Sequence, residues 1–205
     1  MNKQKILCHF ALAALAAVCL PRPAKASFII NIAQSGPDVV ATGSGSLNVS
    51  GLTNGGTHTS VINGFIGPSG DVIELDTTGS QYTAYNGSIA IGPSNLGPAA
   101  SGPFTTSFTG DVVGIQPGLP GVVVVPDGYA SGSALSDSAT WAGTTIAGLG
   151  LTPGTYVYSW GTGPSADTLT LNVTAPEPGS MALIALGGLG LAGFAVRGRS
   201  RRRIR

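Results

Sequence analysis

Two groups of residues in this chain carry side chains that could do chemistry, and the first centres on a histidine. His58 is the only histidine after residue 26, and it follows Gly55 and Gly56 in a segment typical of a turn. A histidine can act as a general base, and a serine and an aspartate from elsewhere in the fold would complete a Ser-His-Asp triad. No Gly-x-Ser-x-Gly motif accompanies it. Two interpretations therefore stand: a triad member, or a histidine in a solvated loop.

The second group is the densest set of acidic residues, Asp71, Glu74 and Asp76. On a strand, Glu74 and Asp76 would share one face and Asp71 would point the other way. Two neighbouring carboxylates suit a calcium ion, or the acid and base of a glycosidase. The spacing matches no calcium-loop signature, so a third interpretation is a solvated strand face beside a turn.

Charge and cysteine content exclude several functions for residues 27–175. This stretch contains eight acidic side chains and no Lys or Arg, hence a formal charge of −8. It cannot neutralise phosphates, so we expect no nucleic-acid partner, and it has no lysine for a Schiff base. Both cysteines, Cys8 and Cys19, precede it, which excludes disulfides and thiolate chemistry. We therefore expect a non-enzymatic protein with no catalytic residue, metal site or cofactor.

The segments that would position these residues read as strands. Gly-Pro and Pro-Gly dipeptides recur throughout and disfavour continuous helices. Short runs of β-branched or alternating residues lie between them, at 28–32, 46–49, 60–66 and 122–125. Strands at such spacing, without amphipathic helices between them, predict an all-β fold. We expect a single antiparallel sandwich or jelly-roll domain, with an exposed loop at residues 93–103.

The clearest hairpin lies near the end of this stretch. Residues 155–160 alternate, 161–165 form a turn, and 168–173 alternate again. Tyr156, Tyr158 and Trp160 share one face of the first strand. That face either packs in the core or binds a sugar, and packing in the core is the expectation.

The first 26 residues have the pattern of a secretory signal peptide. Lys3 and Lys5 precede an apolar run at 6–20, and Ala24 and Ala26 form the small-x-small pattern that signal peptidase recognises. We expect cleavage after Ala26, which makes Ser27 the first residue of the exported protein.

The last thirty residues combine a short motif, an apolar run and a basic end. Pro176, Glu177 and Pro178 precede an apolar segment at 181–196, which predicts one transmembrane helix. Arginines then close the chain: Arg197, Arg199, Arg201, Arg202, Arg203 and Arg205. Because arginine clusters stay on the cytoplasmic side, they act as a cytoplasmic stop and place residues 27–175 outside. The expected organisation is thus a signal peptide (1–26), an acidic all-β domain (27–175) and a tail (176–205).

This tail resembles the PEP-CTERM sorting domain of Gram-negative bacteria. The resemblance implies processing by an exosortase, a membrane protease, after a transient stay in the inner membrane, and delivery to the cell surface or the extracellular matrix. It also implies a bacterium that makes extracellular polysaccharide. The tail is similar, too, to the end of some ice-binding proteins, but a sorting signal accompanies many cargoes and implies nothing about ice here.

Residues 39–45 and 153–161 resemble stretches of small exported proteins that share this tail, a resemblance that implies no activity. We therefore predict an exported surface or matrix protein, associated without catalysis with extracellular polysaccharide. The alternative is an exported hydrolase or carbohydrate-binding enzyme that uses His58 or the Asp71, Glu74 and Asp76 group.

Overall fold

Alternating side chains build the core of this protein. In the first strand Phe28, Ile30 and Ile32 are fully buried, while Ile29 and Asn31 are exposed. The same period of two recurs at residues 134–141, 154–160 and 167–174 and separates a core face from a solvent face. The structure, a computed structural model, describes residues 27–174.

Twelve strands and two short 3-10 helices make up this part of the chain. They are β1 (Ser27–Ser35), β2 (Asp38–Ser46), β3 (Thr53–Thr59), β4 (Phe65–Gly67), η2 (Pro68–Gly70), β5 (Val72–Leu75), β6 (Gln81–Gly92), β7 (Ser107–Gly110), β8 (Val113–Gln116), β9 (Gly118–Pro126), β10 (Ala134–Trp141), β11 (Gly154–Trp160), η3 (Gly163–Ser165) and β12 (Asp167–Thr174).

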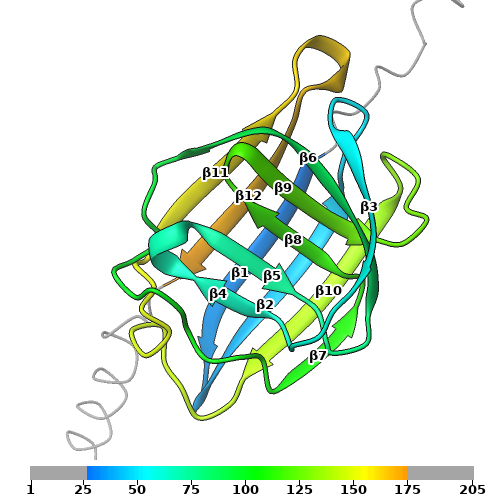
Figure 1. The fold of residues 1–205 in the computed structure, drawn as a ribbon. Helices are drawn as coiled ribbons and strands as arrows, with labels where there is room; N and C mark the ends of the chain where they lie inside the picture. The colour runs from blue at the N-terminus through cyan, green and yellow to red at the C-terminus, as the bar shows by residue number, and fades with distance from the viewer. Residues whose placement is uncertain (1–26, 175–205) are drawn as a thin grey trace, which may run out of the picture.

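The strands form one curled sheet in the order β4-β5-β8-β9-β6-β11-β12-β1-β2-β10-β7, and β3 pairs with β6 off this path. Strand β6 joins the two halves, because residues 82–89 pair with β9 and residues 90–92 pair with β11. The halves lie in two layers whose strands cross (Figure 1). We call β3, β4, β5, β6, β8 and β9 the β5 layer, and β1, β2, β7, β10, β11 and β12 the β1 layer. The buried apolar side chains of both belong to one cluster.

The all-β prediction is confirmed, but not every pair is antiparallel. Strand β1 runs parallel to β12, with Ser27 opposite Thr168 and Ala33 opposite Thr174, whereas the other pairs of this sheet are antiparallel. A parallel pair needs a long connection, and here almost the whole described chain lies between its two strands. Local sequence patterns cannot reveal such a pairing.

The predicted hairpin is confirmed as β11 and β12, joined by a turn that contains η3. Tyr156, Tyr158 and Trp160 are buried, so the core interpretation of this stripe is correct. Residues 93–103 contain no strand, as expected, although Leu96 is fully buried rather than exposed.

Two predicted strands are wrong, because other groups satisfy their backbones. Residues 47–49 are irregular: the Leu47 N–H donates to the Tyr129 hydroxyl, and the Asn48 carbonyl accepts from the Trp160 indole. Most of 60–66 is irregular as well, and only Phe65 and Ile66 belong to a strand. Leu47 and Val49 are therefore buried without a ladder of strand hydrogen bonds, whereas Val61 and Ile62 of the second segment are exposed.

Several expectations concern residues outside 27–174. They are the signal peptide with its cleavage site at Ala26, the Pro176, Glu177 and Pro178 motif, the transmembrane segment 181–196 and the closing arginines. In the described part of the chain, no helix has the length and apolarity needed to cross a membrane.

Candidate functional site

A hollow of about 210 Å³ lies on the solvent face of the β5 layer. We call it the outer hollow. Its lining side chains alternate along their strands with core residues: Glu74 lies between Ile73 and Leu75 of β5, and Val124 lies between Val123 and Val125 of β9. The same alternation that fills the core therefore presents this set of side chains to solvent.

The hollow exists because two outward positions hold small residues. Strand pairing brings Glu74, Gly114, Val124 and Ala84 into one row across β5, β8, β9 and β6. Gly114 and Ala84 have small side chains, so the sheet surface is depressed at these two positions, and larger side chains surround the depression. A Cβ at Gly114 would lie 3.2 Å from the Val124 Cβ and 3.3 Å from the Glu74 Cγ, so a larger residue would crowd both neighbours.

An aromatic pair forms one wall of the outer hollow. His58 on β3 lies opposite Tyr82 on β6, and their rings stack with centroids 5.5 Å apart and planes at 29°. All residues of β3 are exposed, so this strand adds His58 to the edge of the hollow rather than to the core. The histidine expected in a loop or in a triad is therefore a strand residue beside a tyrosine.

Glu74 supplies the acidic group of the outer hollow. Its side chain is partly buried, and burial together with the nearby charge of Asp76 raises its pKa to about 6. The carboxyl group is thus ionised at neutral pH and gains a proton in mild acid. Burial, and then the charges of Glu74 and Asp76, also raise the pKa of Tyr82, which keeps its phenol protonated as a hydrogen-bond donor.

The structure separates the three acids that the sequence grouped. Glu74 lines the hollow, but Asp71 and Asp76 do not. The Asp71 carboxylate accepts hydrogen bonds from the backbone N–H groups of Asn95 and Leu96, both at 2.7 Å, which makes it a structural residue. Asp76 follows the end of β5 and is only 1% exposed. Glu74 and Asp76 therefore do not share an outward face, and the group is not a solvated strand face.

Within residues 27–174, no three His, Cys, Asp or Glu side chains gather in a way that could hold a metal ion. Both Asp76 oxygens and both Asp137 oxygens are buried without a hydrogen-bond partner in the same part of the chain. Neither Asp76 nor Asp137 lines the outer hollow, so neither adds a second acid to its lining.

Sequence reasoning named His58 and Glu74, but not as one site, and it missed Gly114, Ala84 and Gln116. Strand register brings them together, and register depends on pairings between distant segments. One local signal existed: in Val113–Gln116 a small or polar residue alternates with apolar ones, the pattern of a strand with one solvent face.

Comparisons with known proteins add no family assignment: no protein-family model, no curated protein and no solved structure matches this chain.

Proposed function

We propose that this chain is an exported surface or matrix protein that binds extracellular polysaccharide without catalysis. The signal pattern of residues 1–26 and the PEP-CTERM-like tail support export, sorting by an exosortase-like protease and a transient stay in the inner membrane with a cytoplasmic C-terminus. Between them we infer one sandwich-type domain. The all-β core and the uncharged majority of its surface residues suit a secreted binding protein.

The outer hollow is the observation that supports a sugar ligand. Sugar rings have apolar C–H faces and hydroxyl edges, so they need an apolar surface with a few polar groups around it. Ala84, Val122 and Val124 supply the apolar floor. Tyr82 and the stacked His58 supply aromatic surface with polar ends, and Glu74 supplies a strong hydrogen-bond acceptor.

The same residues weigh against the alternative, an exported hydrolase. Glycosidases use two carboxyl groups on either side of the scissile bond. Among the residues that line the outer hollow, Glu74 is the one acid, and His58 has the Tyr82 ring against it. A single carboxyl group beside a stacked histidine fits binding better than acid and base catalysis.

A binding assay tests the proposal with polysaccharide from the producing bacterium as the probe. Tyr82→Ala should weaken binding about tenfold, since truncating a central aromatic residue typically removes more than 1 kcal/mol of binding free energy. Glu74→Gln should also weaken it. Thr59→Ala is the control, because Thr59 lies next to His58 on the exposed strand β3 but does not line the outer hollow. Equal binding by all four proteins would argue against this site.

A hydrolysis assay on the same polysaccharide separates the two functions. Release of reducing ends by the unchanged protein, lost in His58→Ala, would favour the hydrolase. Intact-mass measurement of the surface form tests the processing: we expect a chain that begins at Ser27 and lacks Arg205, and retention of Arg205 would indicate a permanent anchor instead.

A further inference from the structure

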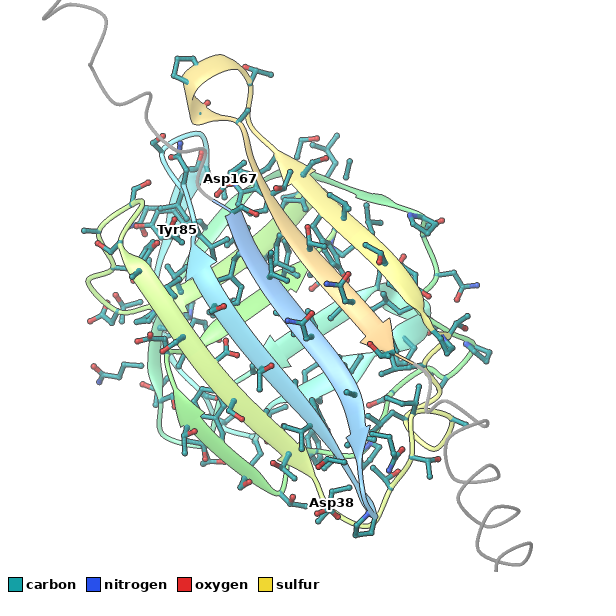
Figure 2. The ribbon with its side chains drawn as sticks, turned by 180° about the vertical axis from the view of Figure 1, so that it is seen from behind. Asp38, Tyr85 and Asp167 are labelled. Carbon is teal, nitrogen blue, oxygen red and sulfur yellow. The ribbon has the colours of Figure 1, made fainter. Side chains whose placement is uncertain are left out.

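A second hollow, of about 640 Å³, lies at the end of the molecule where β1 begins. We call it the N-terminal hollow. Its lining includes Ser27, Leu52, Ser88, Trp160, Ser165 and Asp167. Figure 2 shows Asp167 at this end of β1 and Asp38 at the opposite end, beside the β1–β2 turn.

Among the residues that the structure describes, Asp167 is a buried acid with hydrogen-bond donors, unlike Asp76 and Asp137. It is 5% exposed, and its carboxylate accepts hydrogen bonds from the backbone N–H groups of Asn48 and Thr168. The carboxyl oxygens of Asp76 and Asp137 have no such donors within residues 27–174. Burial raises the pKa of Asp167, and the hydrogen bonds from Asn48 and Thr168 oppose this shift, so its ionised form has donors that Asp76 and Asp137 lack in this part of the chain.

A buried carboxylate calls for a positive partner, and side chains do not supply one here. Residues 27–175 contain no Lys or Arg. The single histidine of that stretch, His58, lies in the outer hollow and not in the N-terminal one. The remaining source of positive charge is the α-amino group of a chain that begins at Ser27.

The register of β1 and β12 brings that amino group to the side of Asp167. Ser27 lies opposite Thr168 in the parallel pair, so the backbone nitrogen of Ser27 lies on the side of Asp167. Ser27 and Asp167 also line the same hollow. A terminal ammonium group there would lie next to the carboxylate rather than in open solvent.

We propose that cleavage after Ala26 creates an α-ammonium group on Ser27 that forms an ion pair with Asp167 in the N-terminal hollow. The proposal rests on the signal-peptide processing proposed above, but not on polysaccharide binding. Signal peptidase breaks the Ala26–Ser27 amide bond with one water molecule: the hydroxyl joins the Ala26 carbonyl, and the hydrogen joins the Ser27 nitrogen. The new carboxyl group loses its proton and the new amine gains one. Removal of the leader thereby supplies the missing cation.

Tyr129 lies near Asp167, and burial raises the pKa of its phenol, with smaller contributions from the charges of Asp167 and Asp111. Tyr129 therefore stays neutral over the range in which an amino group titrates. The charge of the pair changes with pH only through the Ser27 amine and Asp167 themselves.

The processed protein can be tested through a single reactive group, the α-amino group of Ser27. Lys3, Lys5 and Lys25 precede the cleavage site, so the processed protein carries one primary amine, at Ser27. The rate of its acylation by an amine-reactive ester, measured against pH on protein purified from the producing bacterium, gives the pKa of this amine. We expect a pKa about one unit above the ordinary 7.7–8.0, and about fivefold slower acylation at pH 8 than in Asp167→Asn.

Asp38→Asn is the matched control, since it removes the same charge at the other end of β1 and should acylate like the unchanged protein. An ordinary pKa of the Ser27 amine in the unchanged protein would overturn the proposal, and this measurement does not depend on whether any variant folds. Equal rates for the unchanged protein and Asp167→Asn would overturn it as well. A first residue other than Ser27, found by intact mass, would remove its premise and also the processing part of the proposed function.

Discussion

At the scale of single residues, Gly43 explains how a carboxyl group can lie in the core. Gly43 on β2 lies opposite Asp137 on β10, and a Cβ at this position would clash with the Asp137 carboxyl group and the Phe28 ring. The space that a side chain would take is thus occupied by Asp137. Burial raises the pKa of Asp137 to about 7, and the charge of Asp111 adds to the effect.

This raised pKa predicts a domain that is more stable in mild acid than in mild base. Between the unfolded value near 4 and the folded value near 7, the folded state binds more protons, so the free energy of unfolding rises as pH falls through that window. Asp137→Asn should remove most of the gain, on the order of 2 kcal/mol. Urea unfolding of the processed protein at pH 8 and pH 5 measures both.

Asp127→Asn is the control for this prediction. Hydrogen bonds from the Thr57 and Thr83 hydroxyls lower the pKa of Asp127, so its contribution has the opposite sign and its loss should leave the acid stabilisation in place. Stability that is flat from pH 8 to pH 5, or a pH profile that Asp137→Asn leaves unchanged, would contradict the assignment.

At the scale of elements, Asp71 joins three segments. Its carboxylate accepts from Asn95 and Leu96, and its carbonyl accepts from the Tyr158 hydroxyl of β11 at 2.9 Å. The turn before β5, the loop after β6 and the β1 layer therefore meet at one residue. Leu96, which this loop carries, is fully buried in the core. Asp71, which the sequence suggested as a calcium ligand or a catalytic acid, thus fixes the loop after β6 to the turn before β5.

Asp71→Ala should destabilise the protein by about 2–3 kcal/mol, because two backbone N–H groups lose a charged acceptor and the residue has a positive φ of 55° that alanine disfavours. Asp71→Asn keeps an acceptor oxygen and tolerates this backbone, so it should retain most of the stability. Urea unfolding compares the two variants. Equal destabilisation by both would show that the hydrogen bonds to Asn95 and Leu96 contribute little.

Sequence patterns predicted well those strands whose own residues alternate and that are joined by a short turn. β11 and β12 alternate strongly and are joined by a short turn, so local residues determine the hairpin. β2 and β10 consist largely of Gly, Ser, Ala and Thr, and their strand character depends on pairing with β1 and with each other. For the same reason His58 and Glu74 could be named as candidates, whereas their common hollow follows only from the register of five strands.

At the scale of the whole molecule, the acidic groups of residues 27–175 have no Lys or Arg in that stretch to pair with. Residues 27–175 carry a formal charge of −8, and the described strands are held by apolar burial and backbone hydrogen bonds. Like charges in one small domain repel each other and weaken the compact state. The strength of this repulsion depends on the surrounding ions.

Moderate salt should therefore raise the melting temperature of the processed protein at pH 8, because screening shortens the reach of the repulsion to about 10 Å at 0.1 M. Thermal unfolding at low and moderate ionic strength measures the shift. Calcium and magnesium at equal ionic strength should act alike, since no acidic cluster in residues 27–174 is arranged for a metal. A melting temperature that falls with salt, or a much larger effect of calcium, would contradict this view.

The parallel pairing of β1 with β12 also gives the molecule a direction. Ser27 and Thr174 leave the sheet at opposite ends, separated by the rise of six residues, or about 20 Å. A precursor held by both leader and tail would lie along the bilayer, whereas one held by its tail alone can stand upright with Ser27 farthest from the lipid. Loss of the leader would then change the orientation of the protein from parallel to the bilayer to upright. A dye on the Ser27 amine of the tail-anchored form should accordingly escape a quencher carried by the lipid, and strong quenching would rule out the upright orientation.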